Sequence, residues 1–199
     1  MTHFNRGLRL VFMALALLVQ LAVPLSAVQA EEALPVLDKI GGEFTLPGPK
    51  GKPVSRADFK GQVVMLTFGY TYCPDVCPTT LNAMKMLRKK LGADAARFQV
   101  LFITLDPERD TPERLERFVA YFGEGILSLH GSLKEIKTVT ELYRARFMKQ
   151  PSPDGKTYFV AHSDFLYLLD TKGRTRSLFH MDSPVDEMAR DVRRLLSEG

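Results

Sequence analysis

The sequence predicts an α/β fold in which a central mixed β-sheet is flanked by helices on both faces. Two short, nearly continuous apolar runs, 62–68 and 98–105, have the pattern of strands that are buried on both sides. A segment with helical character follows each of them, and a terminal hairpin and a last helix close the chain. Strands that alternate with helices in this way form a sheet that is covered on both faces.

The elements of the first half are predicted from apolar spacing and from helix signals. Residues 31–53 are rich in Gly and Pro, which indicates a turn region leading into the domain. The helix over 78–91 places four apolar residues on one face and ends at Gly92. These residues are Leu81, Met84, Leu87 and Leu91. The next helix starts at Thr111, which caps it before Pro112, and runs to about residue 122.

The second half follows from the same signals. A short strand is predicted over 126–130, a helix over 133–148 and an exposed loop over 151–155. Strands are predicted over 158–161, 165–169 and 175–179, with a turn over 170–173 before the last strand. A final helix is predicted over 184–196. A thioredoxin-like fold has this order, and in it a cysteine motif lies where the first central strand feeds its helix. Cys73 and Cys77 occupy that junction.

The N-terminus has the three-part layout of a secretory signal. Arg6 and Arg9 precede an apolar run over 10–23, and small residues lead to a cleavage position after Ala30. Extended through Val28, the run is 19 residues long, so a retained N-terminal membrane anchor is the alternative. In either case we expect export, with the domain over 31–199 periplasmic or anchored in the inner membrane of a bacterium and facing the periplasm.

The charge balance argues against nucleic acid as a partner. The 199 residues include 27 basic and 23 acidic side chains, and without Arg6 and Arg9 the basic count is 25. The basic residues are scattered along the chain and form no stripe. A hydrophobic content of 45% is average for globular proteins and is sufficient for one core.

The chain has only two cysteines, Cys73 and Cys77. A bridge between them would close so short a loop that it would stabilise little, so the pair is predicted to be reactive. If the chain is helical from Pro74, the spacing stacks both sulfurs on one face, and the helix N-terminus lowers the pKa of a thiol there. Thiolates select soft ions such as Cu(I), and an imidazole ligand would let the site hold Cu(II) as well.

Four histidines are available as a third ligand. His3 lies in the signal, while His130 and His180 each end a strand-like stretch and are predicted to be surface or structural residues. His162 stands in a loop, 160–164, between two apolar strands, where it can face the start of the first helix. Spacing alone still favours a structural role for a lone histidine.

Three motifs resemble those of the SCO/SenC family of copper-binding assembly proteins for cytochrome c oxidase. They are 69–78 around the cysteines, 106–112, and His162-Ser163 followed by 167–170. The resemblance extends from about residue 35 to the C-terminus. It implies a thioredoxin-like fold and Cys73, Cys77 and His162 as metal ligands for Cu(I) or Cu(II), with a dithiol that must be reduced before copper binds. It also implies two partners, the copper-binding subunit of the oxidase and an upstream copper donor or thiol reductant.

Two functions remain open at this point. A copper metallochaperone would deliver the ion to the dinuclear copper site of the oxidase, whereas a thiol-disulfide oxidoreductase would reduce the copper-ligand cysteines of that partner. The oxidoreductase needs only Cys73 and Cys77 as a redox-active pair, so the presence of His162 favours the metallochaperone. Three residues separate the cysteines, against two in thioredoxins, which argues against a general reductase and against a classical enzyme. A peroxidase would need a lone thiolate with a low pKa.

Other side chains in the motifs have competing interpretations. Asp106 and Asp110 either cap the turn before the next helix, which we favour, or support the ligands. Met84 is a soft potential ligand, but its place in the apolar stripe predicts packing. Tyr70 and Tyr72 either shield a metal ion or form a partner surface.

Overall fold

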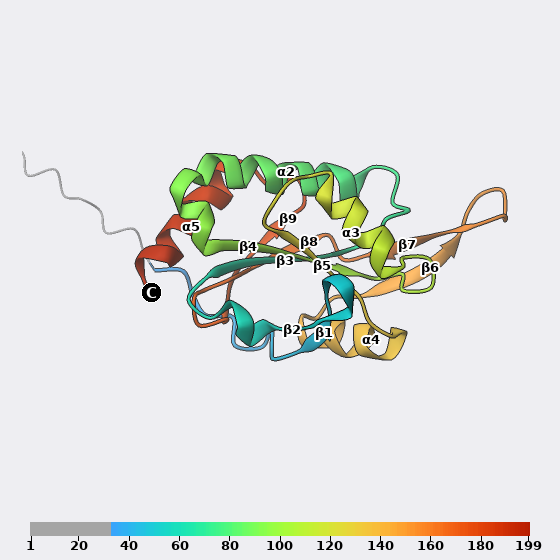
Figure 1. Cartoon of the computed structure of the whole chain (residues 1–199), viewed down its shortest axis with the longest axis horizontal. Helices are drawn as coiled ribbons and strands as arrows, with labels where there is room; N and C mark the ends of the chain where they lie inside the picture. The colour runs from blue at the N-terminus through green and yellow to red at the C-terminus, as the bar shows by residue number, and fades with distance from the viewer. Residues whose placement is uncertain (1–32) are drawn as a thin grey trace, which may run out of the picture. The chain divides into compact units, whose positions relative to one another are not determined.

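The computed structural model describes residues 33–199, and the predicted signal or anchor over residues 1–30 lies outside this range. A five-stranded sheet forms its centre, in the order β5-β4-β3-β8-β9 (Figure 1). The strands are β3 (Val63–Gly69), β4 (Phe98–Thr104), β5 (Ile126–Leu129), β8 (Phe165–Leu169) and β9 (Thr175–His180). Because β3, β4 and β5 run parallel while β8 is antiparallel to β3 and β9, the predicted mixed sheet is confirmed.

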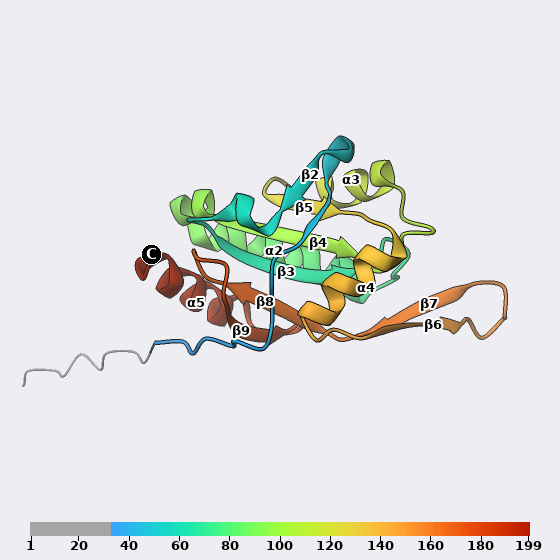
Figure 2. The same ribbon diagram turned by 90° about the horizontal axis from the view of Figure 1, so that it is seen from below.

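Helices cover both faces of this sheet, as predicted (Figures 1 and 2). One face carries α2 (Val76–Leu91), α3 (Pro112–Ala120) and α5 (Val185–Ser197). The other carries α4 (Leu133–Leu142) and a small hairpin of β1 (Thr45–Pro47) and β2 (Pro53–Ser55). Short 3-10 turns complete the list: η2 (Pro49–Gly51), η3 (Arg56–Phe59) and η4 (Gly92–Arg97). Residues Leu34–Gly199 form one compact unit.

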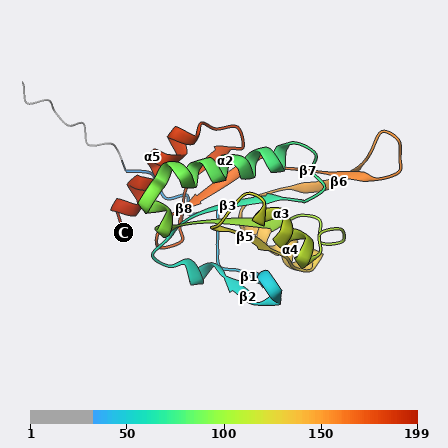
Figure 3. The same ribbon diagram turned by 45° about the horizontal axis from the view of Figure 1, so that its top comes forward.

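The apolar stripe predicted on the first helix is part of the core. Leu81, Met84 and Leu87 are fully buried in α2, which lies beside α5 (Figure 3). Burying one such side chain stabilises the fold by about 1.5–3 kcal/mol. Met84 is therefore a packing residue, as predicted. Every helix within residues 33–199 is too short or too polar to cross a bilayer.

A second hairpin, of β6 (Phe147–Pro151) and β7 (Tyr158–His162), forms a separate sheet that projects from the molecule (Figure 2). The helix predicted over 133–148 is therefore too long, because α4 ends at Leu142 and Arg144 adopts a left-handed conformation with φ of 56°. The loop predicted over 151–155 is also displaced, since Pro151 pairs with Tyr158 and the turn begins after it. The β1–β2 hairpin was likewise not predicted within 31–53.

Candidate metal centre

The cysteine loop joins β3 to α2, and its two thiols have different surroundings. The helix begins at Val76, so Cys73 precedes it, and the condition of a helix from Pro74, under which both sulfurs would stack on one helical face, is not met. Cys77 lies in the first turn and is 2% exposed, while Cys73 is half-buried. The backbone N–H of Cys77 donates to Cys73 Sγ over 3.4 Å, which brings the sulfur of Cys73 to the helix N-terminus.

Gly69 explains how Cys77 can be buried at the end of β3. A β-carbon at this position would lie 2.9 Å from Cys77 Sγ and 2.6 Å from the ring of Phe102. Both distances are below van der Waals contact, so any larger residue would displace the thiol or the ring. The glycine therefore makes room for the thiol against the sheet.

The two cysteines form a polarised pair. The Cys77 thiol donates to Cys73, and this bond, the N–H groups of Cys77 and Asp75, and the charge of His162 lower the pKa of Cys73 to about 5, against the opposing effect of burial. The same thiol bond and burial raise the pKa of Cys77. At neutral pH the site therefore holds one thiolate, Cys73, and one thiol, Cys77.

His162 is the last residue of β7, not a loop residue as predicted. Its Nδ1 lies 2.8 Å from the carbonyl oxygen of Ser163. Because a carbonyl can only accept, Nδ1 carries a proton, so in the neutral ring the lone pair of Nε2 is available for a ligand. The imidazole meets the buried Tyr70 edge-on, with ring centroids 6.4 Å apart. When the ring is protonated, its positive charge lowers the pKa of Cys73.

The predicted ligands therefore share one region, but they do not form a closed site. Over residues 33–199, no three His, Cys, Asp or Glu side chains lie close enough to hold a metal ion. Cys73 and Cys77 are hydrogen-bonded to each other. His162 contacts the ring of Tyr70, which lies three residues before Cys73 in the chain. Thiolate sulfur and imidazole nitrogen suit copper.

Asp110 fixes the start of the cysteine loop. Its fully buried carboxylate accepts hydrogen bonds from the Thr71 N–H and hydroxyl, at 3.0 and 2.6 Å, and from the Thr104 hydroxyl at 2.7 Å. Arg114 Nε donates to the Thr71 hydroxyl over 2.6 Å. The helix cap is Thr111 instead, so the favoured interpretation of Asp110 as a turn cap is wrong.

Arg109 connects the cysteine loop with the projecting hairpin, a role that sequence reasoning missed. Its guanidinium pairs with the fully buried Asp106, donates to the Tyr158 carbonyl over 3.0 Å and lies 3.6 Å from the Tyr158 ring centroid. Tyr72, 46% exposed, is 4.8 Å away from it, and Tyr70 is 5.9 Å away. The Tyr158 hydroxyl donates to Asp106 over 2.8 Å. Asp106 thus supports the hairpin that carries His162.

Within residues 33–199, the other two histidines, His130 and His180, make their contacts elsewhere. His180 lies at the surface, with Nδ1 3.2 Å from a carboxylate oxygen of Asp164. His130 is half-buried at the end of β5 and donates its backbone N–H to Pro47. Both observations agree with the predicted surface or structural roles.

Comparison with known proteins places the chain in a family. The sequence model described as SCO1/SenC matches residues 33–197, and the chain therefore belongs to the SCO1/SenC family. A SCO2-like protein of Rickettsia conorii is 35% identical over 78% of this chain and 76% of that relative. The chain spans only 61% and 58% of the length of the mouse and bovine mitochondrial SCO2 homologues.

Solved structures agree with this assignment. Bradyrhizobium japonicum ScoI, solved with copper bound, is 38% identical over 78% of this chain and 99% of that one, with a TM-score of 0.71. BsSco, described as a member of the Sco family of cytochrome c oxidase assembly proteins with a disulfide switch, is 25% identical over 85% of this chain and 100% of that one, with a TM-score of 0.68. The predicted thioredoxin-like fold is confirmed.

Proposed function

We propose that this protein binds copper through Cys73, Cys77 and His162 and delivers it to the dinuclear copper site of cytochrome c oxidase. The observation that carries the proposal is the pairing of a Cys73 thiolate with Cys77, beside a histidine whose Nε2 is free. Relatives solved with copper bound support the choice of ion.

Each residue has a distinct part in holding the cargo. Cys73 is already a thiolate at neutral pH, whereas Cys77 must give up its proton when copper binds, so binding releases a proton. His162 approaches from a separate hairpin and adds the nitrogen ligand that Cu(II) prefers. Two thiolates alone suit Cu(I), so loss of His162 should weaken Cu(II) binding more than Cu(I) binding.

The test is copper stoichiometry and affinity of the fully reduced protein with Cu(I) and Cu(II). We expect one copper per chain, and a loss of at least about tenfold in Cu(II) affinity for His162→Ala, as for removal of one group from a metal site. The matched control is His180→Ala, which removes an exposed histidine. Equal copper binding by both variants would contradict the three-ligand site.

A second candidate is reduction of the partner's copper-ligand cysteines, favoured by the low pKa of Cys73 next to a buried thiol. Cys73 would attack a partner disulfide and release one partner thiolate. Cys77 would then lose its proton, attack the mixed disulfide at Cys73 and release the second, so that two electrons pass to the partner. Cys77→Ser should trap the mixed disulfide if this occurs, and no trapped species should form with Cys73→Ser.

Export of the domain over 31–199, to a bacterial periplasm or to the periplasmic face of the inner membrane, is part of the same proposal. It rests on the signal-like pattern of residues 1–30. The N-terminal sequence of the mature protein from cell fractions tests it. A first residue of Glu31 would indicate cleavage, an intact N-terminus in the membrane fraction would indicate an anchor, and an intact cytosolic chain would refute export.

A further inference from the structure

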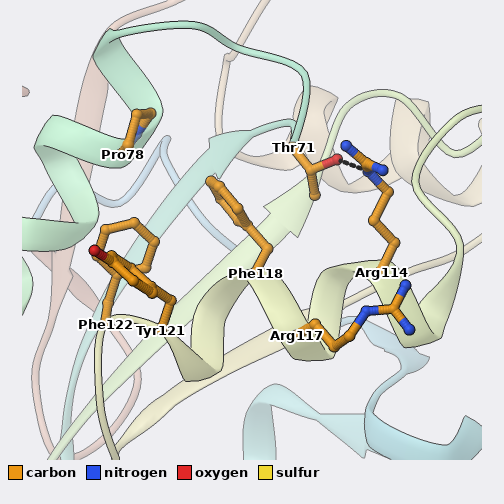
Figure 4. Close-up of a pocket in the computed structure, with 7 residues that line it drawn as sticks. All are labelled: Thr71, Pro78, Arg114, Arg117, Phe118, Tyr121 and Phe122. Carbon is orange, nitrogen blue, oxygen red and sulfur yellow. Dashed lines mark hydrogen bonds between the residues drawn. The ribbon is translucent and has the colours of Figure 1, made fainter.

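A groove runs beside the cysteine loop, between the start of α2 and one side of α3 (Figure 4). Its volume is about 440 Å³. Thr71 and Pro78 line its upper side, and residues of α3 and the turn after it line the remainder. Because Thr71 precedes Cys73 by two residues and Pro78 follows Cys77, an occupant of this groove lies against the segment that carries both thiols.

Packing connects the groove with the buried thiol. The ring of Phe118, which lines the groove, lies 5.8 Å from the ring of Phe102. Phe102 and Cys77 in turn converge on the space above Gly69. Packing of Phe118 on Phe102 therefore connects the groove with the surroundings of the Cys77 thiol.

The groove carries two positive charges. Arg114 and Arg117 are three residues apart on α3, so both lie on the side of the helix that faces the groove. Arg114 is held by the Thr71 hydroxyl and lies 4.0 Å from the ring centroid of Tyr72. Arg117 has an electrostatic interaction with the exposed Glu113, but no ion pair within 4 Å inside residues 33–199.

Exposed aromatic surface lies next to these charges. Tyr121 is 82% exposed and meets Phe122 with ring centroids 5.3 Å apart, and Phe118 meets Phe122 at 5.5 Å. Tyrosine and arginine together are the residues enriched at protein–protein contacts that dominate binding energy. A cationic groove with an aromatic floor complements a segment that is acidic and carries an apolar anchor.

We propose that this groove binds a segment of the oxidase copper subunit that is acidic and carries an aromatic or aliphatic anchor residue. This contact would present the subunit to Cys73. The inference rests on the proposed function, because the same partner exchanges copper or electrons with the cysteine pair. It adds the place of contact and the chemistry of the contacting segment.

The test is binding of the reduced, copper-free protein to the soluble copper-binding domain of the oxidase subunit, by calorimetry at low and moderate salt. We expect Arg117→Glu to weaken binding on the order of tenfold at low salt and to reduce its salt dependence. Arg117 is preferred to Arg114, because Arg114 also supports Thr71. Tyr121→Ala should weaken binding without changing the salt dependence.

Lys137→Glu is the matched control, because it makes the same charge change at an exposed site on α4, on the opposite face of the sheet. Equal effects of Arg117→Glu and Lys137→Glu would overturn the groove as the docking site, as would absence of binding by the parent protein. Copper binding by the parent is measured in parallel. A parent that holds copper and does not bind the domain overturns the docking proposal and leaves the copper site standing.

Discussion

At the scale of single residues, the chemistry of the site depends on the difference between Cys73 and Cys77. One is half-buried at a helix N-terminus and accepts hydrogen bonds, and the other is buried and donates one. The difference assigns them separate roles. Cys73 is the thiol that is accessible to a partner, and Cys77 is the buried second thiol of the pair.

The first prediction concerns the pH dependence of Cys73 alkylation. Only thiolates react, and the pKa of Cys73 is lowered to about 5, so the iodoacetamide rate should rise through pH 5 and be nearly constant above pH 7. Cys77→Ala removes the largest cause of the shift and should move the midpoint upward, toward about 8.5. A midpoint near 8.5 in the parent would refute the polarised pair.

The second prediction concerns Asp110. Asp110→Asn replaces an oxygen that accepts hydrogen bonds by an amide nitrogen that faces donors, at a fully buried position. Urea denaturation should show a loss of about 2 kcal/mol in the free energy of unfolding. Asp94→Asn is the control, because Asp94 pairs with Arg193 at an exposed site and should change stability by less than about 1 kcal/mol. Similar losses would mean that Asp110 does not fix the loop.

Sequence reasoning could single out candidate site residues only where a motif marks them, and their role as ligands stays a prediction. The two cysteines are only four positions apart in the sequence, whereas His162 was singled out by resemblance to the family. The contact of Thr71 with Asp110 spans 39 residues and exists because β3 and β4 run parallel and place Gly69 beside Thr104. No pattern within either segment encodes that neighbourhood, so the role of Asp110 could not be predicted.

At the scale of elements, the β6–β7 hairpin shows the limits of sequence patterns. The sequence of β6, FMKQP, has no β-branched residue and contains a proline, so it has little strand signal of its own. Its strand conformation depends on pairing with β7. By contrast, β3, β4, α2 and α5 have strong periodic patterns, and they were predicted to within two residues.

The third prediction tests the attachment of this hairpin. Arg109→Met leaves Asp106 buried without its cation and removes the bond to Tyr158. The free energy of unfolding should fall by about 3–5 kcal/mol, as for a broken buried ion pair. Amides of β7 should lose hydrogen-exchange protection before those of β3. Lys149→Met, which breaks an exposed pair with Glu108, should have little effect. Uniform loss of protection would show that Arg109 supports the whole fold and not the hairpin.

At the scale of the whole molecule, Arg176 joins the two ends of the described chain. This side chain is 5% exposed and pairs with Asp170 at 3.1 Å and Glu198 at 2.7 Å. It also donates to the carbonyl oxygens of Leu34 and Pro35. One guanidinium on β9 thus holds the segment that enters the domain against the end of α5.

The fourth prediction follows from this arrangement. Arg176→Met should lower the free energy of unfolding by about 3 kcal/mol, because Asp170 and two backbone carbonyls lose a buried donor. Arg174→Met removes a half-exposed partner of the same Asp170 and should cost less than about 1 kcal/mol. Chemical denaturation of both variants distinguishes them, and equal costs would contradict the bridging role.

The placement of His162 on its own hairpin has a consequence for biogenesis. The two sulfurs need only a few residues of chain to meet, whereas the imidazole comes into their region only after β7 has emerged and the hairpin has been fixed by Arg109. A chain that emerges from its N-terminus therefore has both thiols before it has the imidazole, and an oxidant met at that stage can join the thiols as a disulfide before the nitrogen ligand is in place. Under the proposed function, molecules oxidised in this way would need a thiol reductant before they bind copper.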